Sequence, residues 1–213
     1  MEKHYIRRWV MFLLSLMVMA FGVAFAIRAE LGTSPISSYP YIMNLITPLT
    51  FGQFTILMHC ILIALQILIL RKDYQWFQLI QLPVAIAFGL LSDWTLDLLK
   101  GIHYSSYLQQ WIYCGLGILI VALGVSMEIN SKITTLAGEG FVLAVCKKVN
   151  ISVGNMKIIF DCSLVFLAVI FSLVFLHRVE GVREGTLASM LLVGSFVKVF
   201  NKVTSRVAGT EEA

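Results

Sequence analysis

The stretch VMFLLSLMVMAFGVAFAI, residues 10–27, decides the fold class, because it carries no charged residue and is about as long as a membrane-crossing helix. Further apolar runs follow at residues 61–70, 104–127 and 162–176. None alternates between apolar and polar residues with the period of two that is typical of a barrel strand. Since only helices and closed barrels satisfy their backbone in lipid, the runs predict an all-α fold, a polytopic transmembrane helical bundle.

The composition agrees with burial in a bilayer. Of the 213 residues, 59% are apolar and 13% are charged, and the mean hydropathy is +0.87. A soluble domain of this size has too little interior for so much apolar surface, so the lipid bilayer is the predicted partner. The net charge of +4 is small and lies mostly in loops and termini, which argues against a nucleic-acid partner.

Motifs of enzymes are missing from the sequence. It contains no phosphate-binding loop, no nucleophile elbow and no His/Glu spacing of a metal site. We therefore expect no catalysis, no cofactor and no bound metal from the single membrane domain at residues 1–213.

The sequence contains an internal repeat, because shifting it by 102 residues against itself aligns rare residue types without a gap. The aligned pairs include Trp9 with Trp111, Gly22 with Gly124, Thr33 with Thr135 and Gly52 with Gly154. We predict two tandem repeats, at about residues 9–99 and 111–203, followed by a polar cytoplasmic tail at 204–213. Each repeat is expected to hold three spans and one short apolar segment, at 35–47 and 135–147.

The two short segments decide the topology. Each has roughly 13 residues, whereas crossing a bilayer as a helix takes about 20, so both are expected to re-enter. Six spans with two re-entrant segments make the repeats inverted, whereas crossing segments would make eight spans and parallel repeats. Basic residues favour the inverted arrangement, because it places Arg71, Lys72 and Lys132 on the cytoplasmic side together with both termini.

Small residues mark one face of the first span and part of the fourth. They are Ala20, Gly22, Ala24 and Ala26, then Gly115, Gly117 and Gly124. Such residues let helices approach closely, so we expect these faces to pack inside the protein, with dimerisation as the alternative.

The segments that follow the first span of each repeat are typical of helices that begin inside the membrane. The sequence TSP at residues 33–35 predicts a capped helix start, and TTLAGEG at residues 134–140 is its counterpart with glycines in place of proline. A helix that begins there aims its N–H groups at a cavity, although two ordinary surface loops are the alternative. The candidate solute-binding residues in these segments are Thr33, Ser34, Thr134, Thr135 and Glu139.

Polar residues within the spans add further candidates, because ionisable groups in lipid are costly. His59 aligns with Asp161 in the repeat, and the two are predicted to face a central cavity and bind a solute or a proton. In the alternative, His59 bonds to a neighbouring helix and Lys157 neutralises Asp161 across one turn. Gln53 and Asn155 begin equivalent helices, where their amides either bind solute or cap the helix.

Arg28 and Glu30 lie directly after the first span. They are a candidate gate or ion pair, and a simple surface ion pair is the alternative.

The sequence also resembles a known family. The stretches that carry the resemblance are ELGTSPISSYPY at 30–41, FGQF at 51–54, AGEG at 137–140 and VGN at 153–155. They are similar to the YczE/YyaS/YitT-like family of bacterial integral membrane proteins. The resemblance implies a multi-pass protein of the bacterial plasma (inner) membrane without an established activity, and it supplies no substrate residues.

Two functions fit the sequence. The first is a small-solute transporter, or the substrate-binding membrane subunit of one, with its site at the two broken-helix regions and a polar or anionic solute. Since the sequence has no ATP-binding motif, its energy would come from an ion gradient or from partner membrane subunits. The alternative is a non-transporting accessory or regulatory membrane protein.

Overall fold

The computed structural model describes residues 2–208, and every regular element within that range is helical. Six helical stretches are long and apolar enough to cross a membrane: Tyr5–Arg28, Phe51–Asp73, Trp76–Leu98, Tyr107–Ser131, Val153–Leu176 and Glu184–Ala208. The predicted all-α membrane bundle is confirmed, and six helices have the length and composition of membrane spans. The elements are α1 (Glu2–Arg28), α2 (Pro35–Ile46), α3 (Phe51–Leu70), η1 (Arg71–Asp73), η2 (Trp76–Ile80), α4 (Gln81–Leu98), α5 (Tyr107–Ser131), α6 (Ala137–Val149), α7 (Val153–Phe171), η3 (Ser172–Leu176) and α8 (Glu184–Ala208).

The surface of the bundle carries many large apolar side chains. Leu191, Leu108, Phe166 and Leu187 are each more than 60% exposed, and similar residues follow the outer faces of the spans. Lipid tails accept such surface without the free-energy cost that water would impose. The chain is therefore a multi-pass membrane protein.

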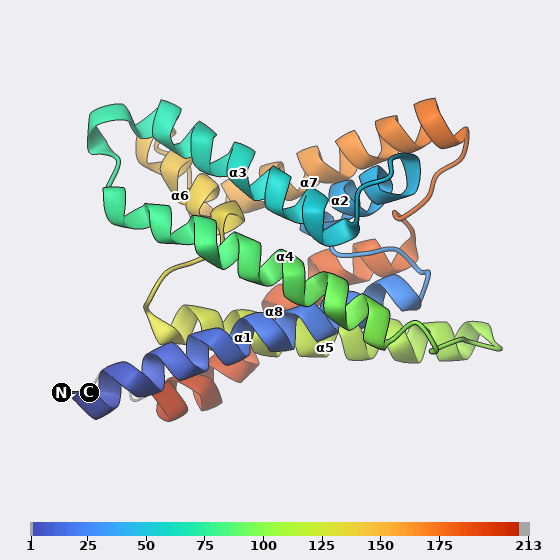
Figure 1. The fold of residues 1–213 in the computed structure, drawn as a ribbon, viewed down its shortest axis with the longest axis horizontal. Coiled ribbons are helices and arrows are strands. Elements are labelled where there is room, and N and C mark those ends of the chain that lie inside the picture. The colour runs from blue at the N-terminus through green and yellow to red at the C-terminus, as the bar shows by residue number, and fades with distance from the viewer. Residues whose placement is uncertain (1, 209–213) are drawn as a thin grey trace.

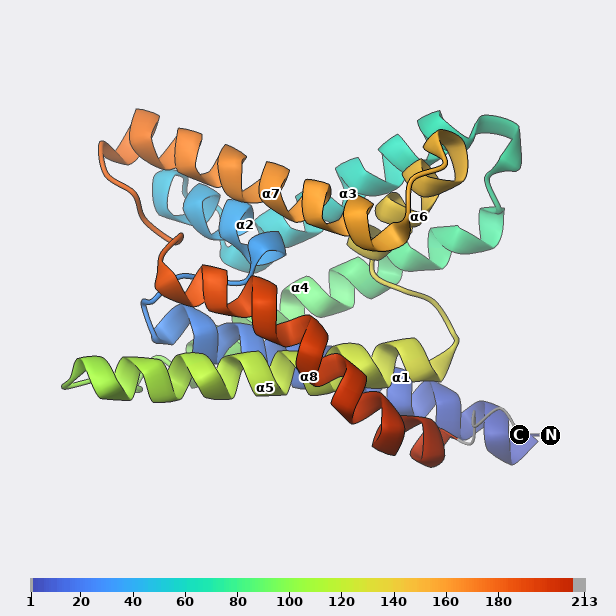
Figure 2. The ribbon, with the colours of Figure 1, turned by 180° about the vertical axis from the view of Figure 1, so that it is seen from behind.

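The helices lie in two groups along the long axis of the molecule (Figures 1 and 2). One group contains α1, α5 and α8, the other contains α2, α3, α6 and α7, and α4 crosses between them. The start of α1 and the end of α8 lie at the same end of the molecule, which we call the terminal end. The two short helices each begin toward the middle and run outward, α6 toward the terminal end and α2 toward the opposite end.

Small residues hold α1 against α5, which confirms the predicted internal packing for Gly22 and Gly117 but not for Gly115, where nothing lies within 4 Å of an added Cβ. A Cβ added at Gly22 would lie 2.6 Å from the backbone nitrogen of Val121, and one at Gly117 would lie 2.9 Å from the backbone nitrogen of Ala26. Ala20 and Ala24 are fully buried. The two helix backbones therefore touch directly, and this face serves internal packing.

The final helix extends further than the expected span. The polar tail was predicted to begin at residue 204, but α8 continues to Ala208. Thr204 is buried, and its hydroxyl accepts a hydrogen bond from Asn130 Nδ2 at 2.8 Å. This contact with α5 keeps the last turn helical, and residues 209–213 of the predicted tail lie outside the described part of the chain.

Candidate functional site

A cavity of about 60 Å³ lies where α2 and α6 begin, and we call it the central cavity. Most of its lining is apolar, contributed by α1 through α6. Its polar lining residues are Ser34, Ser37, Thr55, His59, Glu128 and Glu139. The fold thus brings three of the predicted candidates together, namely Ser34, His59 and Glu139.

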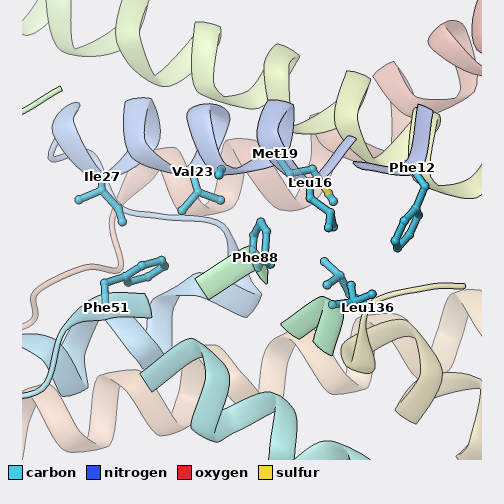
Figure 3. Close-up of a cluster of buried hydrophobic side chains, with 10 residues drawn as sticks. Phe12, Leu16, Met19, Val23, Ile27, Phe51, Phe88 and Leu136 are labelled. Carbon is cyan, nitrogen blue, oxygen red and sulfur yellow. The ribbon is translucent and has the colours of Figure 1, made fainter. Parts of the chain in front are cut away.

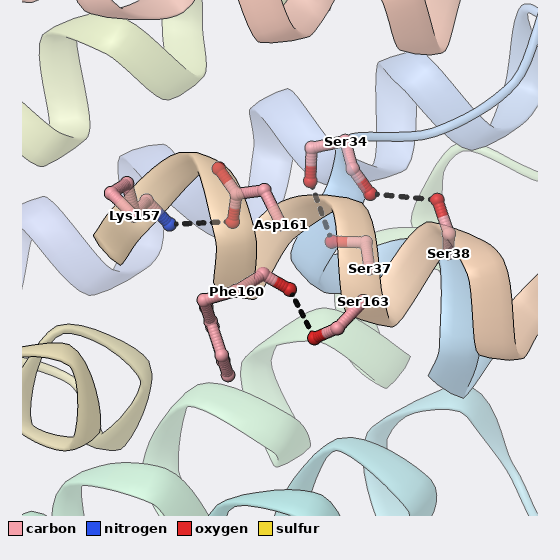
Figure 4. A network of polar contacts seen from close by, with 7 residues as sticks. All are labelled: Ser34, Ser37, Ser38, Lys157, Phe160, Asp161 and Ser163. Carbon is pink, nitrogen blue, oxygen red and sulfur yellow. Dashed lines mark hydrogen bonds and ion pairs between the residues drawn. The ribbon is translucent and has the colours of Figure 1, made fainter. Parts of the chain in front are cut away.

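Serine hydroxyls organise the start of α2 (Figure 4). Ser34 precedes the helix, and its carbonyl oxygen accepts from the backbone N–H groups of Ser37 and Ser38. Its hydroxyl donates to Ser37 Oγ at 2.9 Å and makes no capping bond to the helix backbone. The expected side-chain cap at Ser34 is therefore wrong, since the first N–H groups of α2 are satisfied by the Ser34 carbonyl oxygen and not by its hydroxyl. Thr33 is buried against Ser38, with 3.2 Å between the hydroxyl oxygens.

A glutamate from another helix fixes the segment that leads into α6. Glu128 of α5 is 2% exposed, and its Oε1 accepts a hydrogen bond of 2.6 Å from the backbone nitrogen of Leu136. Glu139, in the first turn of α6, is half-buried, and its Oε2 is buried without a hydrogen-bond partner. Thr134 and Thr135 are half-buried and line a different, open pocket.

His59 occupies the α3 side of the central cavity. Its side chain is 1% exposed and its ring stacks on that of Phe88, with 6.3 Å between the ring centroids. Nδ1 is buried and has no hydrogen-bond partner. The alternative drawn from the sequence was a histidine hydrogen-bonded to a neighbouring helix, and Nδ1 makes no such bond.

Asp161 does not line the central cavity. Lys157 Nζ donates to Asp161 Oδ1 at 2.9 Å, an ion pair across one turn of α7 (Figure 4). The same ammonium interacts electrostatically with Glu139 and Glu128. Neutralisation of Asp161 by Lys157, the alternative drawn from the sequence, is therefore what the structure contains.

The two amides predicted at helix starts lie outside the cavity, and both are exposed. Gln53 forms a reciprocal capping box with Thr50: its Oε1 accepts from Thr50 N at 3.0 Å, and its backbone nitrogen donates to Thr50 Oγ1 at 3.1 Å. At Asn155 the backbone nitrogen donates to Ser152 Oγ at 3.4 Å. Gln53 thus has the capping role that the sequence left open beside solute binding.

Arg28 and Glu30 line an open pocket of about 400 Å³ at the end opposite the terminal end, which we call the α2 pocket. The predicted ion pair between them is not formed, because each has another partner. Arg28 Nη2 donates to Leu96 O at 2.7 Å, and the Glu30 carboxylate accepts from the Tyr104 hydroxyl. That hydrogen bond raises the pKa of Tyr104.

A second open pocket, the α6 pocket of about 380 Å³, lies toward the terminal end. Lys132, Thr134 and Thr135 line it. Glu128 lines both this pocket and the central cavity, so its side chain lies at the boundary between them.

An apolar layer separates the central cavity from the α2 pocket (Figure 3). Val23 and Phe88 line the cavity, Ile27 and Phe51 line the pocket, and all four belong to one buried cluster. In Figure 3 the α1 side chains point toward Phe51 and Phe88 across this layer. The cavity therefore borders an open pocket on one side and closed apolar packing on the other.

Sequence reasoning missed Glu128 as a site residue. The repeat aligns it with Ala26, so the comparison of the halves gave no polar partner for it. A carboxylate at the end of a long apolar run was the signal that could have found it. Gln66 was also missed: it is fully buried and its Nε2 donates to Ala137 O and Gln81 Oε1, both at 3.1 Å, which ties α3 to the start of α6.

Comparison with known proteins identifies the family of the chain, and the names of the matching proteins state no activity. The chain is 24% identical over 195 residues to the uncharacterized protein YyaS of Bacillus subtilis (strain 168), covering 91% of this chain and 92% of YyaS. It is 23% identical over 149 residues to the uncharacterized membrane protein YczE of the same organism, covering 70% of this chain and 67% of YczE. No solved structure matches the chain.

These matches confirm the predicted resemblance to YczE and YyaS. A protein family described as "Family of unknown function (DUF6198)" matches residues 6–202, which is most of the chain. The protein is therefore a multi-pass membrane protein that belongs to the DUF6198 family.

Proposed function

We propose that this protein is a small-solute transporter, or the solute-binding membrane subunit of one, whose site is the central cavity. One observation carries the proposal: His59 Nδ1 and Glu139 Oε2 are both buried without a partner, and both residues line this cavity. A buried polar atom without a hydrogen bond is costly, and native proteins leave few of them. A bound solute that satisfies both atoms explains why they are placed there.

The arrangement of the short helices supports the proposal. Residues that begin α2 and residues that begin α6 line the same cavity, although about 100 residues separate them in the chain. We propose that both helices re-enter the membrane and that the halves 9–99 and 111–203 are inverted repeats. Transporters with inverted repeats commonly bind their solute where discontinuous helices begin near the bilayer midplane.

The lining favours one class of solute. Two carboxylates, Glu128 and Glu139, face the cavity, so a neutral or cationic solute fits better than the anion considered from the sequence. The volume of about 60 Å³ equals the space of roughly two water molecules, so the structure as described holds only a small group. An ion gradient or partner subunits would supply the energy, and the protein would catalyse no reaction.

We place the protein in the bacterial plasma membrane with both termini in the cytoplasm. Arg71, Lys72, Lys132, Lys147 and Lys148 support this orientation, because basic residues concentrate on the cytoplasmic side. The α6 pocket would then open to the cytoplasm, and the α2 pocket would face outward.

The test is uptake by proteoliposomes that contain the purified protein, screened with small neutral and cationic metabolites. We expect at least one to accumulate above empty liposomes, and His59→Ala and Glu139→Gln to lower its uptake about tenfold or more, since each removes a direct contact. Gln53→Ala is the matched control, because Gln53 lies in an exposed helix cap and should leave uptake unchanged. If no solute is taken up, the transport proposal fails and the alternative, a non-transporting accessory or regulatory membrane protein, is favoured.

A further inference from the structure

The central cavity carries more negative than positive charge. Glu128 and Glu139 line it, while Asp161 already matches the charge of the nearby Lys157. Lys157 interacts electrostatically with both glutamates, yet one ammonium faces three carboxylates in total. The parts of α1, α2 and α4 that line the cavity contribute only apolar and hydroxyl side chains, and α3 adds His59 as its one titratable group.

Two carboxylates that share a small and mostly apolar space cannot both stay ionised without a further positive charge. Taking an ion out of water is costly unless an opposite charge or several hydrogen bonds replace the water. Glu128 has one such bond, from the backbone nitrogen of Leu136, and Glu139 Oε2 has none. The site therefore takes up a positive charge, either a proton or a small cation.

The lining fits a proton better than a metal ion. Hard cations such as Mg²⁺ and Ca²⁺ take six or more oxygen ligands, more than a cavity of about 60 Å³ with mostly apolar walls presents. Among the described side chains of residues 5–208, no three from His, Cys, Asp or Glu are grouped as metal ligands. A proton needs only one carboxyl oxygen to hold it and a further acceptor in the same cavity, and His59, which lines that cavity, has its Nδ1 without a partner.

We propose that Glu128, Glu139 and His59 form a proton-binding site, loaded from the α6 pocket, through which transport is coupled to protons. The coupling of protons to transport rests on the proposed transport function, whereas proton binding at the three residues does not. Glu128 borders the water-accessible α6 pocket, whereas the layer of Ile27, Phe51 and Phe88 closes the other side. Protons therefore reach the site from one side of the membrane in this conformation.

The loading step is a simple proton transfer. A hydronium ion in the α6 pocket gives its proton to a carboxylate oxygen of Glu128: one O–H bond of hydronium breaks, one carboxyl O–H bond forms, and water leaves. The pair then carries one negative charge instead of two. Passage of that proton to Glu139 or to His59 Nδ1 inside the cavity leaves Glu128 free to accept another.

Infrared spectroscopy of the purified protein tests the site without any solute. We expect wild-type protein at neutral pH to show the carbonyl band of a protonated carboxylic acid, which shifts in D₂O. Glu128→Gln and Glu139→Gln should each lose the band, because removing one carboxylate removes the repulsion between the two that favours holding a shared proton. Glu184→Gln, which changes an exposed carboxylate at the start of α8, should keep it.

Several outcomes would overturn the assignment. Absence of the band in wild-type protein, or its persistence in both substituted proteins, excludes a shared proton at this pair. Loss of the band on adding sodium chloride at constant pH would make the site a cation site instead. Circular dichroism and gel filtration check that each variant is folded, and His59→Gln, which should shift the band, gives a second readout if a glutamate variant does not fold.

The same data separate this inference from the proposed function. Solute uptake that is independent of a pH gradient, with no protonated carboxyl band, would reject the proton site and leave the transporter standing. A band that depends on Glu128 and Glu139, with no solute transported, would support the proton site and reject the transporter.

Discussion

Asp93 joins α4 to the start of α3 through two hydrogen bonds. Its Oδ1 accepts from the backbone nitrogen of Gly52 at 2.7 Å, and its Oδ2 accepts from Thr50 Oγ1 at 2.5 Å. A carboxylate at a helix N-terminus satisfies free N–H groups and interacts well with the helix dipole. Asp93 therefore has a structural role, although it lines the α2 pocket.

Replacing Asp93 by Ala should lower the stability of the folded protein. The change leaves the buried Gly52 N–H without its partner, at a cost of about 1–3 kcal/mol, whereas the exposed Thr50 hydroxyl can bond to water instead. The measurement is the thermal unfolding midpoint in detergent. Asp97→Ala is the matched control, since Asp97 is exposed one turn later on the same helix and lines the same pocket. An equal loss in both variants would contradict the capping role.

His59 and Asp161 show which parts of the site could be predicted from single residues of the sequence. The sequence identified both as costly polar groups in apolar spans, and His59 does face the cavity. The repeat suggested that Asp161 would match it, but Lys157 lies one turn before Asp161 and pairs with it. Glu128 completes the cavity from α5, and it was missed because its position in the first half is occupied by Ala26. Local sequence shows which groups need a partner, while packing decides which partner they meet.

At the scale of elements, the contact between α1 and α5 organises one side of the bundle. Gly22 and Gly117 face each other so closely that the backbones touch, as a Cβ at Gly117 would lie 2.9 Å from Gly22 O. Close approach adds van der Waals contact, which drives helix association in lipid where the hydrophobic effect does not. The spacing of small residues predicted this packing face, but it did not say which helix would cover it.

Gly117→Ala should destabilise the protein by about 1–3 kcal/mol, because the added methyl group has no room and the helices must separate. Gly115→Ala is the matched control two residues away in the same helix, where nothing lies within 4 Å of an added Cβ. It should be neutral or stabilising by up to about 1 kcal/mol, since alanine is the better helix former. Thermal unfolding of both variants measures the difference, and equal midpoints would contradict the tight contact.

At the scale of the whole molecule, the order of the spans places the loops at two ends. The segment between α3 and α4 lies at the terminal end, and the segment between α4 and α5 lies at the opposite end (Figure 1). The central cavity lies between them, open toward the terminal end through the boundary at Glu128 and closed by the apolar layer toward the other. Alternating access would require that layer to open while the α6 pocket closes.

Cysteine labelling in intact cells tests the orientation. In a protein whose four native cysteines are replaced, Lys72→Cys should stay unlabelled by a membrane-impermeant maleimide, and His103→Cys should be labelled. Both positions should react after the cells are permeabilised, which controls for local accessibility. Labelling of Lys72→Cys from outside would reject the inverted arrangement. If Lys72→Cys and His103→Cys were labelled from the same side, the helix between them would not cross the membrane.

The sequence by itself determined that the chain is helical and lies in a membrane, where its spans are, and where the chain breaks to begin α2 and α6. These features depend on hydropathy, length and local helix-start chemistry, which neighbouring residues specify. Only the tertiary structure decided that Glu128, Glu139 and His59 meet in one cavity and that Asp161 does not. The physical reason is that lipid-facing and protein-facing sides of these spans are equally apolar, so periodicity does not reveal which faces pack together.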